Sequence, residues 1–265
     1  MSSHPNLTSV MREVANVAKQ QRFAADGAIK DTAFAVRTGM QTAMRASFDR
    51  PTPFVLSGVR VAFERPGGNL EGVVHIDPEG TQASPEDVLR AEVYGGARGL
   101  KGAERRLQSV GLMLPGDYMV PSKELLSQGN LVDAYGNVRG SFIRTLLSYL
   151  QAFNTSGFSA NATKKTRDRI AARGKSAGGF ATINGVAYFV SKGRGERNGK
   201  QQHLPAGIWA KRGIHGSNVY PVFLFVSAPH YTERLRFHEV AKNVAERTFP
   251  QKFAERYARA LATAK

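Results

Sequence analysis

The chain has 265 residues, 42% of them apolar, and a formal net charge of +16 at pH 7. That length accommodates one large domain or two small ones, each with a real hydrophobic core. The chain has no cysteine, which excludes disulfides and thiolate metal sites, and no stretch approaches the roughly 20 apolar residues that span a bilayer.

The N-terminal segment has helical periodicity over residues 6–48. Pro51 must end this helix, whereas Gly27 and Gly39 weaken the pattern, so one kinked helix and two separate helices are both open. A helix of this length with one apolar stripe usually lies across a sheet or packs on a neighbouring subunit. The stripe consists of Leu7, Val10, Met11, Val14, Val17 and Ala18, and further along of Ala33, Val36, Met40, Met44 and Phe48.

Two strands joined by a turn are expected next, over residues 53–64 and 70–77. The sequence Pro66-Gly67-Gly68-Asn69 between them has the composition of a turn. Short helices are expected over residues 85–94 and 101–109.

The middle of the chain begins with an expected loop through Pro115-Gly116-Asp117 and Pro121. An amphipathic helix is expected over residues 139–153. The polar and basic segment 154–177 that follows is interpreted as a mobile loop, or as an arm that becomes ordered only on a partner.

The last third of the chain alternates apolar and polar residues in three runs, which predicts antiparallel strands over 180–190, 207–212 and 219–227. The Asn184-Gly185 pair predicts a tight hairpin, because a type I′ turn needs positive φ at both central positions. A basic closing helix is expected over residues 231–263.

Pro250 is expected to interrupt the closing helix, since proline is favoured in the first turn of a new helix. These elements together predict a single α+β domain over residues 1–265. Its antiparallel sheet would have about four to six strands and be flanked by long N- and C-terminal helices. The pattern allows for an inserted acidic element at 65–130 and a flexible basic arm at 154–177.

Motifs that carry chemistry are not found in the sequence. The glycine-rich stretches 95–102 and 193–200 do not match a phosphate-binding loop, which needs Gly, four residues and Gly-Lys-Ser/Thr. The six histidines are never closer than eight residues along the chain, so no zinc site is predicted. An acidic cluster formed by Asp77, Glu79, Glu86, Asp87 and Glu92 is better explained by surface solvation or ion pairs than by acid-base work. We therefore expect no catalytic residue, no metal and no cofactor.

Positive charge is concentrated in one region. Residues 139–228 hold 14 basic and 2 acidic side chains, whereas residues 51–138 hold 8 basic and 11 acidic ones. A basic field of this size favours a phosphate polyanion or an acidic protein surface, and the plainer explanation is solubility and avoidance of self-association. The candidate contact residues are Lys164, Lys165, Arg167, Arg169, Arg173, Arg194, Arg197, Lys200, Lys211 and Arg212. Contact with DNA would be non-specific and strongly dependent on salt.

Three segments, in this order, carry a resemblance to a known family. They are MREVANVAKQQRFAADGAIKDTAFAVRTGMQTAMRASF, LVDAYGNVRGSFIRTLLSYLQAF, and LPAGIWAKRG with VYPVFLFVSAPHY and the closing RLRFHEVAKNVAERTFPQKFAERYARAL. Their order resembles the minor tail or tail-completion proteins of the lambda Z type in tailed phages. The family has no catalytic residues to carry over to this chain.

The resemblance implies a structural role in the virion, at the neck, where the subunit would join the portal or connector to the tail and surround the DNA channel. We would expect a hexameric or dodecameric ring, with synthesis in the host cytoplasm, since the N-terminus lacks a signal-peptide pattern. A ring needs two self-interacting surfaces on each subunit. The alternative is a basic DNA-binding or packaging-associated protein outside the virion. An enzyme acting on nucleic acid or cell wall would need an acid-base or metal set that the sequence does not display.

Overall fold

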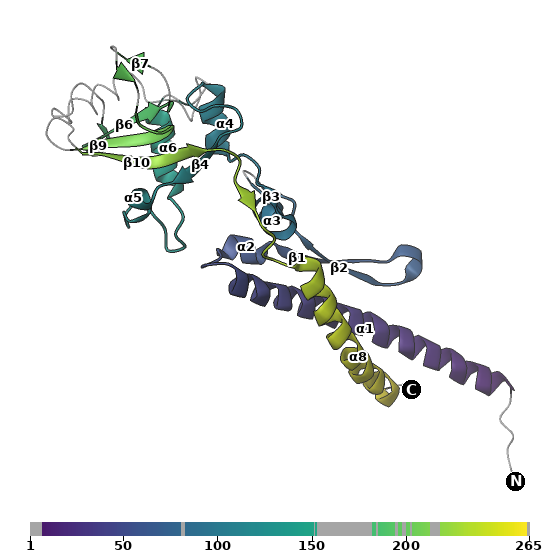
Figure 1. Cartoon of the computed structure of the whole chain (residues 1–265). Coiled ribbons are helices and arrows are strands. Elements are labelled where there is room, and N and C mark those ends of the chain that lie inside the picture. The colour runs from purple at the N-terminus through teal and green to yellow at the C-terminus, as the bar shows by residue number, and fades with distance from the viewer. Residues whose placement is uncertain are drawn as a thin grey trace, which may run out of the picture. The chain divides into compact units, whose positions relative to one another are not determined.

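The chain forms two compact units, Met1–Gly95 with Thr232–Lys265 (unit 1) and Gly96–Tyr231 (unit 2) (Figure 1). The computed structural model describes residues 7–80, 83–150, 152, 182–183, 185–193, 196–197, 200–201, 203–212 and 218–263.

This division bears on two expectations about domains. Where a single domain was expected, the chain divides into two compact units, each with its own cluster of buried apolar side chains. The boundary after Gly95 also falls inside the expected insert at 65–130, and the segment that is inserted is the whole of unit 2. The basic arm expected at 154–177 lies outside the described residues.

Unit 1 consists of four helices, a 3-10 turn and a two-stranded antiparallel hairpin among its described residues. They are α1 (Leu7–Ser47), α2 (Pro53–Ser57), β1 (Val59–Glu64), η1 (Pro66–Gly68), β2 (Glu71–Ile76), α3 (Pro85–Tyr94) and α8 (Phe237–Thr263). In the hairpin Val59 pairs with Ile76 and Glu64 with Glu71.

The long N-terminal helix is confirmed and is unbroken: α1 passes through both Gly27 and Gly39 as one helix. At Gly39 the reason for glycine is spatial, because a Cβ added there would lie 2.9 Å from Cγ2 of Val244 in α8. The absence of a side chain therefore lets the two helices approach closely. Further along the same contact, Arg256 of α8 binds both carboxylate oxygens of Asp31, at 2.8 and 2.9 Å.

The closing helix differs from expectation at Pro250, where α8 continues without a break. A proline inside a helix removes one donor to the carbonyl of the fourth preceding residue. Pro250 is exposed, so water can reach the carbonyl that loses its partner.

The strand expected over residues 53–64 begins only at Val59. Residues Pro53–Ser57 form a short helix instead, because Thr52 provides an N-cap and Pro53 is favourable in the first helical turn. The Thr52 hydroxyl accepts a hydrogen bond from the Val55 N–H at 3.3 Å.

Helix α3 lies where it was expected and begins with a reciprocal cap. The Ser84 hydroxyl accepts from the Asp87 N–H, and the Asp87 carboxylate accepts from the Ser84 N–H, both at 3.0 Å. The core of unit 1 joins this helix to α1 and to the start of α8. Its buried members are Met40, Met44, Val59, Leu89, Val93, Leu235 and Phe237.

Unit 2 is built on a five-stranded antiparallel sheet in the order β4-β10-β9-β6-β5. The expected α+β class and an antiparallel sheet of four to six strands are therefore confirmed. The described elements are β3 (Gly96–Ala97), α4 (Gly102–Ser109), β4 (Tyr118–Pro121), α5 (Lys123–Leu126), α6 (Gly140–Tyr149), β5 (Thr182–Ile183), β6 (Val186–Ser191), β7 (Glu196–Arg197), β8 (Lys200–Gln201), β9 (Gly207–Arg212), β10 (Asn218–Val226) and β11 (His230–Tyr231).

A hairpin joins β5 to β6 where the Asn184-Gly185 pair predicted one, although Asn184 itself lies outside the described residues. Ile183 pairs with Val186, and Gly185 has φ +80°, which glycine adopts without steric cost. Strand β4 is a further difference, since it lies in the segment expected to be a loop up to Pro121. It becomes a strand because β10 supplies its partner, with Phe223 opposite Pro121 and Val226 opposite Tyr118.

The core of unit 2 lies between α6 and the sheet. Phe142 and Tyr149 of α6 both contact the Tyr188 ring edge-on, with centroids 5.9 and 6.2 Å apart. Burial raises the pKa of Tyr188 to about 12, because the charged form would lose its water. The buried apolar members are Leu107, Met113, Met119, Leu125, Phe142, Leu146, Leu147, Ala152, Val186, Tyr188, Ile208, Ala210, Val222 and Phe223.

A buried ion pair between Arg98 and Glu104 lies near the N-terminal start of unit 2. The Glu104 side chain is 0% exposed and accepts hydrogen bonds from Nη1 of Arg98 at 2.8 Å and from the Met119 N–H at 2.8 Å. Arg98 also lies over the Tyr118 ring, 4.9 Å from its centroid. Burial alone would raise the pKa of Glu104, but the hydrogen bonds from Arg98, Lys101 and Met119 outweigh it and lower that pKa.

No helix within the described ranges combines the length and the apolar character needed to cross a membrane.

Candidate functional site

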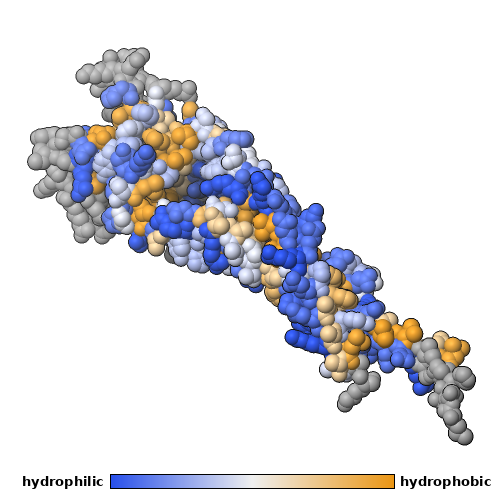
Figure 2. Space-filling model, turned by 60° about the horizontal axis from the view of Figure 1, so that its bottom comes forward, coloured by the Kyte–Doolittle hydropathy of each residue, from blue (hydrophilic) through white to orange (hydrophobic). Residues whose placement is uncertain are grey.

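The first turns of α1 carry a row of exposed apolar side chains. Leu7, Met11 and Val14 are 74%, 64% and 64% exposed, and Val17 continues the row at 37%. Spacings of three and four residues place these side chains on one face of the helix. Every side chain from Met11 to Lys19 is exposed, and hydrophobic surface gathers at the lower right of Figure 2.

The row lies on the part of α1 beyond the contacts that α8 makes in this chain. Arg256 lies beside Gly27 and Asp31 of α1, and α8 ends at Thr263, about two turns later. The two helices run in opposite directions, since Val244 meets Gly39 further along α1. The N-terminal end of α1 therefore continues past the C-terminal end of α8, as Figure 1 shows.

The exposed row lies on the same helical stripe as Gly39, one of the points where α1 contacts α8. Alternating steps of three and four residues lead from Leu7, Met11 and Val14 through the buried Ala28 to Gly39, where α1 meets α8. The exposed part is thus the continuation of a face that, elsewhere in the same helix, is used to bind another helix.

Helix α8 has an apolar row of its own. The rings of Phe249 and Phe253 stack with centroids 6.1 Å apart, and those of Phe253 and Tyr257 with centroids 5.8 Å apart. Leu261 extends the row by one more turn and is 46% exposed. We call Phe249, Phe253, Tyr257 and Leu261 the α8 ladder.

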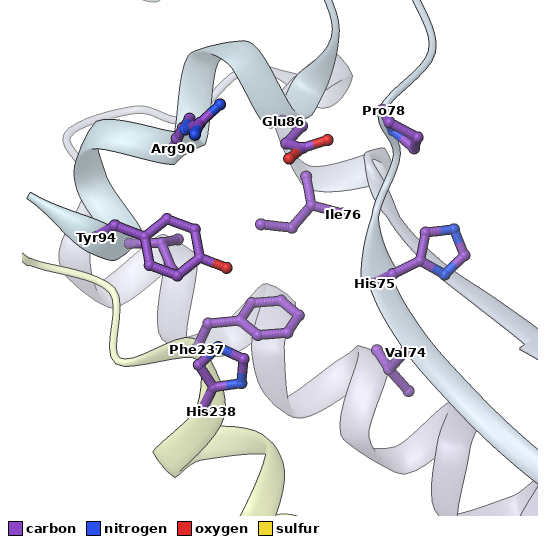
Figure 3. Close-up of a pocket in the computed structure, with 10 residues that line it drawn as sticks. Val74, His75, Ile76, Pro78, Glu86, Arg90, Tyr94, Phe237 and His238 are labelled. Carbon is purple, nitrogen blue, oxygen red and sulfur yellow. The ribbon is translucent and has the colours of Figure 1, made fainter.

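A hollow of about 370 Å³ in unit 1 is the second candidate site (Figure 3). Its apolar floor includes Ile76 and Phe237, whose side chains point inward, and polar groups form its rim. The Tyr94 ring lies 6.4 Å from the His238 ring. The full lining is Val74, His75, Ile76, Pro78, Glu86, Arg90, Val93, Tyr94, Phe237 and His238.

The chemistry of this hollow suits an inserted side chain. An apolar floor with a polar rim is the usual form of a socket that receives an anchoring residue of a partner. Over the described part of the chain, no group of three or more His, Cys, Asp or Glu side chains could hold a metal ion. Sequence reasoning missed the hollow, because its walls come from β2, α3 and α8, which are distant along the chain.

Only four of the ten basic residues proposed as partner or DNA contacts lie among the described residues. Lys211 and Arg212 end β9, and as neighbours in a strand they face opposite sides of the sheet, so they do not form one patch. Arg197 and Lys200 pair across β7 and β8, where only the backbone is described. The remaining candidates, Lys164, Lys165, Arg167, Arg169, Arg173 and Arg194, lie outside the described residues.

Ion pairs and caps account for much of the acidic cluster, as expected. Asp77 pairs with Arg60 at 3.1 Å, and Glu92 pairs with Arg234 at 2.7 Å. The pKa of Asp77 is lowered by the hydrogen bond from the Glu79 N–H and then by Arg60.

The LVDAYGN segment, which contributed to the family resemblance, forms a closed loop. Val132 and Val138 bridge its ends, and the Asp133 carboxylate accepts from the N–H groups of Tyr135 and Asn137 at 2.9 and 2.8 Å. The Asn137 N–H contributes most to the lowered pKa of Asp133. The Asp133 carboxylate thus closes the loop that precedes α6.

A scan of protein-family models and searches of curated proteins and of solved structures found no match to this chain.

Proposed function

We propose that this chain is a structural subunit, which works by assembling into a larger particle. The observation that carries the proposal is the exposed apolar row on the projecting end of α1. Apolar rows on helices are normally buried, and each buried methylene contributes about 0.8 kcal/mol. A row presented on a rigid 41-residue helix therefore favours a partner that covers it.

The particular role that we propose is a neck or tail-completion subunit of a tailed phage, joining the portal or connector to the tail. It rests on the family resemblance of the three sequence segments. The basic region 139–228 supports this role, because a subunit around a DNA channel meets a polyanion. The two apolar rows in unit 1 also supply the kind of self-interacting surfaces that a ring requires.

The alternative is a basic protein that binds or helps to package DNA without entering the virion. The same excess of Lys and Arg favours it. This alternative predicts that the free protein binds duplex DNA and that its affinity falls steeply as the salt concentration rises.

The experiment that tests the proposal counts copies of the chain in purified virions by quantitative mass spectrometry, with the portal protein as internal standard. We expect six or twelve copies per particle, since rings at a phage neck share the symmetry of the tail or of the portal. Absence from the particle would contradict the structural role. DNA binding measured over a salt series would then decide whether the alternative takes its place.

A further inference from the structure

We propose that the projecting end of α1 docks on the α8 ladder of a second copy of this chain. This inference rests on the proposed function of the chain as an assembly subunit, and it names the partner and the two surfaces. One surface is the row formed by Leu7, Met11, Val14 and Val17. The other is the ladder formed by Phe249, Phe253, Tyr257 and Leu261.

The first step is the kind of surface that α1 is built to bind. Its exposed row lies in register with Gly39, which packs against Val244 of α8 in the same chain. A seam that continues past the end of its own partner helix is best completed by another helix. Helix α8 is the type of helix that this seam already binds.

The second step is that α8 has apolar surface to offer. Phe249 and Leu261, at the two ends of the ladder, are 37% and 46% exposed, and Phe253 and Tyr257 between them are partly buried. Stacked aromatic rings present a large and rigid area at a low cost in side-chain entropy, which suits a docking surface.

The third step concerns symmetry. The row and the ladder are different surfaces, so each copy would give its α1 end to one neighbour and receive an α1 end from the other. Such a head-to-tail contact closes into a ring if the rotation between copies allows it. The proposed contact therefore supplies the two self-interacting surfaces that the ring of the proposed function needs.

The test uses the full chain, whose lack of cysteine makes introduced thiols unambiguous. We would prepare Val14→Cys, Phe249→Cys and Leu261→Cys singly and mix the first with each of the others at high protein concentration. A short thiol-specific crosslinker would then be added. We expect a dimer that contains one copy of each variant, identified by the crosslinked peptides.

A matched control is Asn16→Cys, at a position that is also exposed but lies on the opposite face of α1 from Val14. It should crosslink to either α8 position at least tenfold less than Val14→Cys. The double variant Met11→Lys and Val14→Lys should lower the mass of the assembled species measured by light scattering, while circular dichroism shows an unchanged helix content.

Three outcomes would overturn the inference. One is crosslinking of Val14→Cys only to itself, which would indicate pairing of two α1 ends. Another is equal crosslinking by the two α1 positions. The third is an unchanged mass for the double Lys variant, which would point to another protein or a lipid surface as the occupant. Any of these, together with six or twelve copies per virion, would refute the contact and leave the proposed function standing.

Discussion

Glu104 shows how much of unit 2 depends on one side chain. It is fully buried and binds the Arg98 guanidinium and the N–H groups of Lys101 and Met119. The hydrogen bonds tie the start of α4 to β4, so the carboxylate fixes segments that have no backbone ladder between them. Replacing both members of such a buried ion pair by apolar residues changes the free energy of unfolding little. Removing one member is strongly destabilising, because the other is left as an unpaired buried charge.

We predict that Glu104→Gln destabilises unit 2 by about 3–5 kcal/mol, because it leaves the largely buried Arg98 without its counter-charge. The measurement is chemical denaturation at neutral pH, with the exposed Glu124→Gln as the control. A loss no larger than that of the control would contradict a role of Glu104 in holding the unit together.

The same carboxylate predicts a pH dependence. The pKa of Glu104 is lower in the folded chain than in the unfolded chain. Its contribution to folding stability is therefore complete above the unfolded pKa of about 4.3. It is then lost as pH falls through the folded pKa. The difference in stability between the natural chain and Glu104→Gln should therefore shrink in acid.

At the scale of elements, the close approach of α1 and α8 is the feature that organises unit 1. Gly39 permits the approach, and Asp31 with Arg256 adds a bidentate ion pair along the same contact. The Arg256 hydrogen bond is the main cause of the lowered pKa of Asp31. This ion pair is partly exposed and screened by solvent, so the packing of the helices is the larger contribution.

Gly39→Val is predicted to destabilise unit 1 by about 1–3 kcal/mol, because its Cβ would lie 2.9 Å from Val244 and force the helices apart. Thermal unfolding followed by circular dichroism measures the effect. Valine has a higher helix propensity than glycine, so propensity alone would stabilise α1, and a loss of stability would be due to the contact with α8. Ala46→Val, at an exposed position of the same helix, shows the effect of a valine away from that contact. A melting temperature of Gly39→Val no lower than that of the natural chain would show that the contact tolerates a side chain.

At the scale of the whole molecule, the chain passes twice between its units, and the ends of each unit lie close together within that unit. In unit 2, β3 and β11 pair, with His230 opposite Ala97. In unit 1, the N–H groups of Arg234 and Leu235 both donate to the Glu92 carbonyl, at 2.9 and 3.0 Å. The geometry is that of one domain inserted into another.

We therefore predict that the units fold separately. Residues 96–231 expressed alone should unfold cooperatively on heating, because their buried core is contained within unit 2. A chain in which a short Gly-Ser linker joins Gly95 to Thr232 should likewise fold as unit 1. Failure of either piece to show a cooperative transition, while the full chain does, would indicate that the units stabilise each other.

The sequence by itself determined the elements whose signals are local. Three- and four-residue spacing predicted α1, alternation predicted β6, β9 and β10, and Asn184-Gly185 predicted the hairpin between β5 and β6. The apolar stripe on the first helix was also visible in the sequence, together with the expectation that it would cover a sheet or a neighbouring subunit.

Only the tertiary structure decided which part of that stripe is buried within the chain and which part is exposed. The part of α1 beside Gly39 is covered by α8, whereas the part from Leu7 to Val17 is exposed. The division into two units, the strand β4 and the hollow between β2, α3 and α8 likewise depend on pairings between distant residues. Local periodicity carries no information about such pairings, since they are chosen by the shape and burial of surfaces that meet only in the folded chain.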